Sequence, residues 1–210
     1  MLIHKLWIIR QVRAVSLDFQ KTLESHRDSL LNVDLATFPK PSNPSIPHPY
    51  AQIFHALKQK TLEVLNKNHY FLTQESQTKK AVYLTPSDLE LLQSHAMITI
   101  STQSKSLEKN LFVLSTIVTL APFMGLLGTV WGILETFSGL QGGAAVSSNS
   151  AILGGISTAL ATTVLGLIIA IPALISYNYF RNAMRNYGSD MDDFLAEQLS
   201  TLELQYKKVE

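Results

Sequence analysis

Two charge-free stretches decide the fold of this chain: NLFVLSTIVTLAPFMGLLGTVWGIL (residues 110–134) and TFSGLQGGAAVSSNSAILGGISTALATTVLGLIIAIPALISYNYF (residues 136–180). Glu135 separates them and is the only charged residue between positions 110 and 180. At a rise of about 1.5 Å per residue, either stretch is long enough as a helix to cross a hydrocarbon core of about 30 Å. The second is also long enough to supply a turn. We therefore expect an all-α membrane protein built on a transmembrane helical hairpin.

The lysines and arginines predict how this hairpin is oriented. Thirteen of the 17 lie in residues 1–109 and four in residues 181–210, and the connecting segment 139–150 has none. By the positive-inside rule, both ends are expected in the cytoplasm and the connecting loop outside it. The net charge of +1 and the lack of a basic stripe argue against nucleic-acid binding. The absence of cysteine excludes disulfides and thiolate metal sites.

The remaining segments predict long cytoplasmic helices. Residues 1–109 are expected to be a cytoplasmic helical region, with a helix over 1–32, an exposed Pro-rich linker over 39–49 and a further helix over 50–66. Thr85-Pro86-Ser87-Asp88 predicts a helix start, with a threonine cap and an acid in the first turn. No breaker follows until Pro122, so one long helix should continue into the first span, 110–137. A periplasmic loop (138–151), a second span (152–180) and an amphipathic cytoplasmic helix (181–210) complete the expected order.

Small residues mark one face of each span. Nine of the ten glycines lie between positions 125 and 166, and in lipid small residues allow helices to approach closely. The residues expected in helix packing are Gly125, Gly128, Gly132, Gly155, Ala159 and Gly166, with Pro122 and Pro172 bending the helices. Thr129 and Thr163 lie on the same faces. Their hydroxyls either bond a backbone carbonyl or line a wet cavity, and spacing alone leaves both alternatives open.

The two predicted membrane spans contain almost no ionisable side chain that could carry a proton. Glu135 lies near the outer end of the first span, where an interfacial, solvated carboxylate is favoured over a buried proton carrier. A proton-conducting role would therefore need a second protein that supplies a titratable group. The six histidines all lie in residues 1–109, without metal-ligand spacing, and are expected on the solvated surface. We find no catalytic, cofactor-binding or metal-binding motif, and do not expect an enzyme.

Residues 121–133, APFMGLLGTVWGI, and residues 155–167, GISTALATTVLGL, resemble the second- and third-span signatures of the MotA/TolQ/ExbB proton channel family, specifically its TolQ/ExbB branch. The resemblance covers about residues 107–182. It implies a bacterial inner-membrane subunit that forms a homo-oligomeric ring in the lipid bilayer, a pentamer in this family. Two copies of an ExbD/TolR-type single-span partner would supply the pore aspartate, and a TonB- or TolA-type protein would carry force to the outer membrane. By this resemblance Thr129 and Thr163 are pore threonines, with Thr162 and Thr158 beside them on the proton pathway.

The sequence departs from the family in two places. Many relatives carry a glutamate at the position of Thr158, so we expect proton handling there to be weaker, shifted to water or left to the partner. The family also has a first membrane span that this sequence lacks; residues 1–20 resemble the segment that follows such a span, and we hypothesise that the native start lies upstream. Two other roles stay open: a non-conducting membrane scaffold, and a MotA-like stator subunit.

Overall fold

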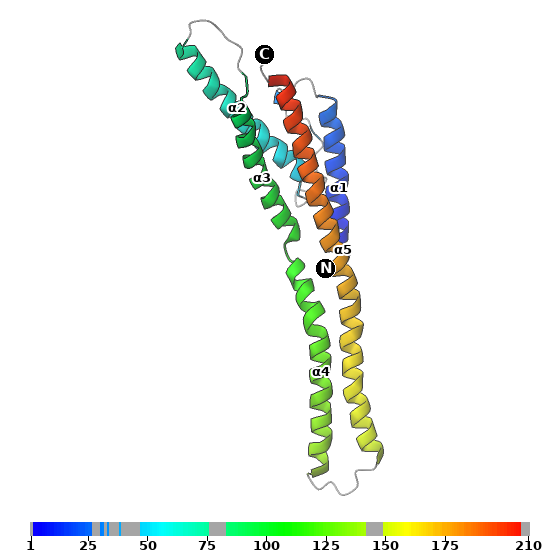
Figure 1. Ribbon diagram of the computed structural model, residues 1–210. Helices are drawn as coiled ribbons and strands as arrows, with labels where there is room; N and C mark the ends of the chain where they lie inside the picture. Colours follow the sequence, from blue (N-terminus) through cyan, green and yellow to red (C-terminus); the bar gives the residue numbers. More distant parts are fainter. Residues whose placement is uncertain are drawn as a thin grey trace. The chain divides into compact units, whose positions relative to one another are not determined.

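The computed structural model describes residues 2–26, 30, 31, 33, 38, 47–75, 83–141 and 149–206. Its regular elements are the helices α1 (Leu2–Glu24), α2 (Pro49–Glu75), α3 (Pro86–Glu108), α4 (Leu111–Gln141) and α5 (Asn149–Tyr206), as labelled in Figure 1. No strand occurs among the described residues. The chain divides into two compact units: a hairpin unit (Lys109–Asn182) and a bundle unit (Met1–Glu108 with Ala183–Glu210). Helix α5 contributes to both.

The hairpin unit consists of α4 and the first part of α5, which run side by side (Figure 1). Two stretches, Leu111–Gly139 and Ser150–Tyr206, meet the length and hydropathy expected of a membrane-crossing helix. Large apolar side chains point away from the unit; Phe112 is 70% exposed and Trp131 66%. Such a surface suits lipid rather than water. Pro122 and Pro172 each lie inside a continuous helix.

The expected single helix from Pro86 into the first span is interrupted. α3 ends at Glu108 and α4 begins at Leu111, and between them Asn110 has a φ of 68°, in the left-handed region. Among residues with a side chain, Asn and Asp enter this region most readily, because their short polar groups hydrogen-bond locally. A left-handed Asn ends a helix in the way that glycine does. The break coincides with the boundary between the two units.

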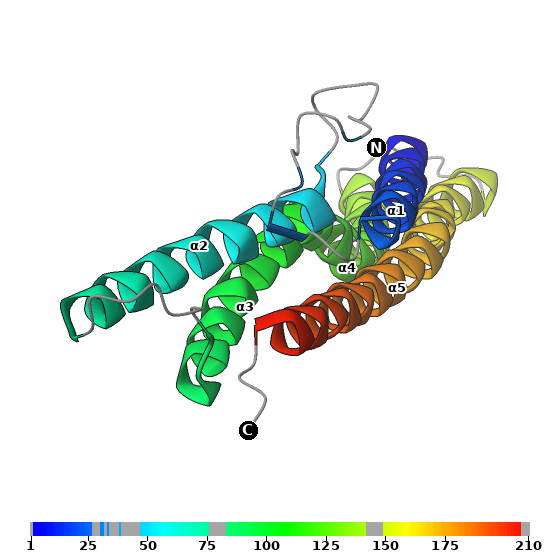
Figure 2. The same cartoon turned by 90° about the horizontal axis from the view of Figure 1, so that it is seen from above.

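The bundle unit has an aromatic core. α2 packs against both α1 and α3, and in Figures 1 and 2 α1 lies beside the second part of α5. Phe19 of α1 stacks edge-on against Phe54 of α2 and Phe194 of α5. The apolar face predicted for residues 181–210 is buried here, at Met184, Tyr187, Met191, Phe194, Leu195 and Leu202. Amphipathic periodicity was therefore sufficient to identify this face.

The helix ends in the bundle unit differ in detail from expectation. α1 ends at Glu24, eight residues before the predicted end, and α2 continues to Glu75, beyond the predicted 66. Pro49, assigned to the linker, is the first residue of α2, where its missing N–H and fixed φ are favourable. The rest of the predicted linker, 39–46, lies outside the described residues.

The predicted start of α3 is confirmed. The helix begins at Pro86, the Asp88 N–H donates to the Thr85 hydroxyl at 3.2 Å, and the Thr85 N–H donates to the Asp88 carboxylate at 2.9 Å. This is a reciprocal capping box that satisfies two backbone donors at once.

One histidine does not lie where the sequence analysis expected it. His48 precedes α2, its Nδ1 accepts the Ala51 N–H at 3.3 Å, and its ring packs edge-on against Phe19 at 5.1 Å. It caps a helix at the edge of the aromatic core, so the expectation that all six histidines are solvated surface groups is wrong for His48.

Candidate functional site

Helices α4 and α5 touch through their small residues. A Cβ added to Gly166 would lie 2.6 Å from the Ala121 carbonyl oxygen and 3.1 Å from the Gly125 Cα. A Cβ on Gly125 would lie 3.0 Å from the Thr163 Cα. These neighbours are backbone atoms that no side-chain rotation can move, so the two backbones are in direct contact at this level.

The contact continues toward the loop end of the hairpin with more side-chain participation. A Cβ on Gly132 would lie 2.8 Å from the Ala159 Cβ, and one on Gly128 would meet the Thr162 side chain at 2.5 Å. Gly155 faces the Thr136 side chain in the same way. The structure thus brings the six small residues named in the sequence analysis to one helix contact. Of the two prolines, Pro122 is half-buried and Pro172 is exposed.

A groove of about 860 Å³ opens between the loop-side halves of α4 and α5. It is lined by Met124, Leu127, Gly128, Trp131, Gly132, Glu135, Thr136 and Gly139 of α4 and by Ala151, Ile152, Gly155, Thr158, Ala159 and Thr162 of α5. On α4 the lining runs from Met124 to Gly139, a distance along the helix of about 22 Å at 1.5 Å per residue. The groove therefore reaches well into a hydrocarbon core of about 30 Å.

Two threonine hydroxyls meet one backbone carbonyl at the inner end of this groove. The Thr163 hydroxyl donates to the Gly125 carbonyl oxygen at 3.1 Å. The Thr162 hydroxyl donates to its own helix at Ala159 O (2.6 Å) and also lies 3.2 Å from Gly125 O. Gly125 and Gly166 are in backbone contact here, next to Met124 and Thr162, where the groove lining ends; we call this the closed end of the groove.

The other candidate hydroxyls are bonded within their own helices. Thr158 is exposed, lines the groove and donates to Gly154 O at 2.9 Å; Thr136 donates to Gly132 O at 2.7 Å. Thr129 is only 8% exposed and donates to Leu126 O at 2.7 Å. A hydroxyl that donates its hydrogen bond to a carbonyl keeps both lone pairs, so it can still accept a hydrogen bond from water. Thr158, Thr162 and Thr136 are placed to do so.

The four candidate pathway threonines therefore fall into two groups. Thr158 and Thr162 line the groove, whereas Thr163 lies at its closed end and Thr129 is buried. Sequence reasoning did not identify Glu135, Thr136 and Trp131 as neighbours of this groove. The available signal was the spacing of three and four residues that links Gly128, Trp131, Gly132, Glu135 and Gly139 on one face of α4.

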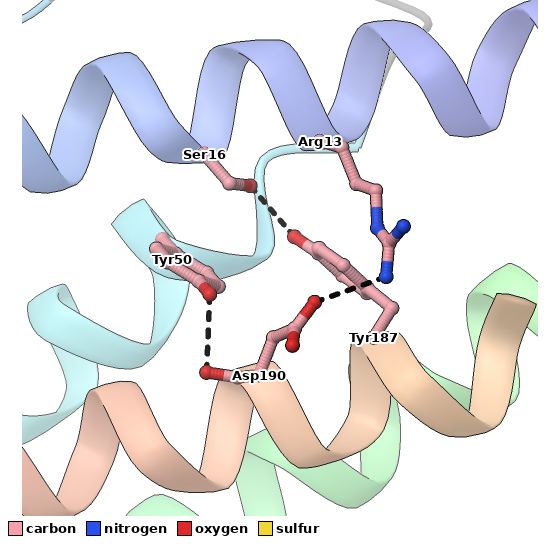
Figure 3. Close-up of polar contacts among 5 residues, drawn as sticks. All are labelled: Arg13, Ser16, Tyr50, Tyr187 and Asp190. Carbon is pink, nitrogen blue, oxygen red and sulfur yellow. Dashed lines mark hydrogen bonds and ion pairs between the residues drawn. The ribbon is translucent and has the colours of Figure 1, made fainter.

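A second polar cluster lies in the bundle unit (Figure 3). Arg13 of α1 pairs with the Asp190 carboxylate of α5 at 3.2 Å, and the buried hydroxyls of Ser16 and Tyr187 share a hydrogen bond of 2.6 Å. The Tyr50 hydroxyl donates to the Asp190 backbone carbonyl at 3.0 Å. Burial, and secondarily the Asp190 charge, raises the pKa of Tyr50 to about 12, and burial also raises the pKa of Tyr187. Both phenols therefore stay neutral and join α1 and α2 to α5.

Comparison with known proteins gives one family match and several relatives. Residues 63–193, more than half of the chain, match the family described as "MotA/TolQ/ExbB proton channel family". A biopolymer transport protein ExbB of Pseudomonas putida is 38% identical over 101 residues, which is 48% of this chain and 30% of that protein. A Tol-Pal system protein TolQ of Haemophilus influenzae is 39% identical over 94 residues, 43% of this chain and 41% of that protein. An ExbB of Aquifex aeolicus is 39% identical over 99 residues, covering 47% and 66%. The chain thus spans under half the length of the first two relatives.

Proposed function

Because the chain belongs to the MotA/TolQ/ExbB proton channel family, we propose that it is a subunit of an ExbB/TolQ-type complex in the bacterial inner membrane. In this proposal both ends of the hairpin are cytoplasmic, and copies of the chain form a homo-oligomeric ring. An ExbD/TolR-type single-span protein supplies the aspartate that is protonated and released. Proton flow then drives work at the outer membrane through a TonB- or TolA-type protein.

The hydroxyl-lined groove of the hairpin unit is the observation that supports proton conduction. Thr136, Thr158 and Thr162 present hydroxyl oxygens to this groove, and its lining ends next to the junction of Thr162 and Thr163 with Gly125 O. In lipid, a cavity with several hydrogen-bond acceptors is a place where water can be held. The proposed pathway runs along this groove, past Thr158 and Thr162 to Thr163, with Thr129 buried in the hairpin near it.

The hairpin alone does not complete a pathway. Between residues 110 and 180 the sequence has no histidine, lysine, arginine or aspartate, and one glutamate. The groove lining ends at Met124 on α4 and at Thr162 on α5, next to the backbone contact of Gly125 and Gly166. A titratable group on a second protein, set against the closed end of the groove, would allow the proton to continue.

The same hydrogen bonds support one alternative, a non-conducting scaffold. Thr129, Thr158, Thr162 and Thr163 all donate to carbonyls of the chain, as hydroxyls in a purely structural contact would. The two functions differ in what happens when a hydroxyl is replaced by a methyl group of the same shape, because packing is kept and water binding is lost.

Reconstitution with the single-span partner tests the proposal. Vesicles containing both proteins should take up protons when a pH gradient is imposed, as reported by a pH-sensitive dye inside them. Thr162→Val and Thr163→Val should each lower the flux about tenfold while the complex assembles normally in size-exclusion chromatography. Thr116→Val is the matched control, because Thr116 is exposed, donates to Phe112 O within its own helix and does not line the groove. Unchanged flux in both Thr162→Val and Thr163→Val, with normal assembly, would contradict a conducting role of these hydroxyls and favour the scaffold.

A further inference from the structure

Glu135 is unusual because a carboxylate is placed in a membrane hairpin that offers it no countercharge. It is the only charged residue between positions 110 and 180, and that segment contains no histidine. Its side chain is exposed, so it fills no gap in the helix contact. Near the outer end of the span a solvated carboxylate costs little, so the place of Glu135 on the groove, rather than a cost of burial, is what points to a function.

The position of Glu135 relates it to the groove. It lines the groove together with the hydroxyl-bearing residues Thr136, Thr158 and Thr162. The lining residues of the described chain include no Lys, Arg or His, so Glu135 is the one titratable side chain on this surface. Along α4 it precedes the last lining residue, Gly139, by one turn and follows Met124, at the closed end, by 11 residues, or about 16 Å. Glu135 therefore lies toward the loop end of the groove.

We propose that Glu135 takes up a proton at the loop end of the groove and passes it to water inside the groove. This rests on the proposed function and deepens it, because it names a proton-binding residue of this chain in addition to the partner's aspartate. The carboxylate accepts a proton from a hydronium ion or a buffer acid outside, which is left as water or as the conjugate base. Protonated Glu135 then gives the proton to groove water and returns to the carboxylate.

Hydroxyl oxygens continue the path inward from Glu135. Thr158 and Thr162 are one turn apart on α5 and both line the groove, so their lone pairs can hold a short file of water molecules. The file ends where the Thr162 and Thr163 hydroxyls meet Gly125 O. In this arrangement Glu135 sets the rate of proton entry, and the threonines set the rate of passage.

Proton uptake by reconstituted vesicles, with the single-span partner present, separates this role from that of a surface charge. Glu135→Gln keeps the size of the side chain but removes the carboxyl group that binds the proton. We expect about tenfold lower proton flux, and the flux should no longer depend on the outside pH. Glu135→Asp should keep at least a third of the flux. The matched control is Glu90→Gln, the same chemical change on an exposed helical residue of the bundle unit. It should leave flux unchanged.

Rescue of the flux by a diffusible buffer is a second measurement, and a purely structural role of Glu135 would not produce it. Adding imidazole outside should restore flux to Glu135→Gln, because the buffer delivers protons directly to the groove, but not to Thr162→Val. The proposal is overturned if Glu135→Gln conducts like the wild type with the same pH profile, or if imidazole gives it no gain. Absence of flux in the wild-type complex would instead overturn the proposed function, and this inference with it.

Discussion

Gly166 offers the sharpest test of the contact between α4 and α5. In Gly166→Ala the new methyl carbon would lie 2.6 Å from the Ala121 carbonyl oxygen, about 0.8 Å inside the 3.4 Å at which ordinary contact begins. The neighbouring atoms are backbone, so the helices must separate. Overpacking of this kind costs about 1–3 kcal/mol. The intrinsic helix preference of alanine over glycine returns up to about 1 kcal/mol.

With about 1 kcal/mol returned, the net loss is about 0–2 kcal/mol. We therefore expect Gly166→Ala to lower the free energy of unfolding by about 1 kcal/mol, which corresponds to a midpoint roughly 2–4 °C lower for a chain of this size. Thermal unfolding of the detergent-solubilised protein, followed by circular dichroism, measures it. Gly154→Ala is the matched control: it lies on the same helix, and an added Cβ would meet nothing within 4 Å. It should be neutral or slightly stabilising. If Gly166→Ala melts at or above the midpoint of Gly154→Ala, the backbones do not touch there and the described register of the hairpin is wrong.

Three further predictions concern the rest of the chain. Partial burial alone would raise the pKa of Asp88, but the hydrogen bonds from Thr85 and Asn68 outweigh it and the net pKa is lowered. The stability of the wild type should therefore fall as the pH drops through this lowered pKa. In thermal melts over a pH series, Asp88→Asn should be about 1 kcal/mol less stable than the wild type at pH 7 and should lack this pH-dependent contribution. Asn110→Gly should unfold like the wild type, whereas Asn110→Val should lose about 1–2 kcal/mol because a β-branched residue resists the left-handed conformation; equal melts would contradict the described break. Tyr187→Phe should lower the free energy of unfolding by about 1–3 kcal/mol, because the Ser16 hydroxyl stays buried without this partner, and the added Ser16→Ala should recover part of the loss. If the melting shifts of the two substitutions simply add, the 2.6 Å hydrogen bond does not stabilise the fold.

The sequence was sufficient for the parts of the fold that depend on local chemistry. The lack of charge identified the two spans, the Thr85 cap identified the start of α3, and a spacing of three and four residues identified the buried face of the second part of α5. In each case one helix and its immediate surroundings determine the outcome. No knowledge of a neighbouring element was needed.

The break at Asn110 and the position of His48 could not be predicted with the same ease. No proline or glycine marks residues 109 and 110, and asparagine is compatible with both the right-handed helix and the left-handed stop. His48 follows a proline-rich stretch that reads as exposed. Its partial burial involves contact with Phe19, 29 positions earlier, which only the tertiary structure brings to it.

The family resemblance named the four candidate threonines, but the sequence did not give their arrangement. The sequence analysis named Thr129, Thr158, Thr162 and Thr163 together. Which of them borders the groove depends on the register of α4 against α5, because that register decides which threonine meets Gly125 and Gly128. A shift of one residue rotates every side chain by about 100°, so spacing within one helix cannot fix the pairing with another.

The acceptor at the closed end of the groove belongs to the main chain, and this limits how the site can vary. Every amino acid at position 125 would carry the same oxygen, so an alanine scan cannot delete it and would report Gly125 only as a tight fit. Tuning of this junction, in evolution or in the laboratory, must therefore act through the donors at positions 162 and 163. Replacing the amide that follows Gly125 by an ester would be the direct chemical route to weakening the acceptor itself.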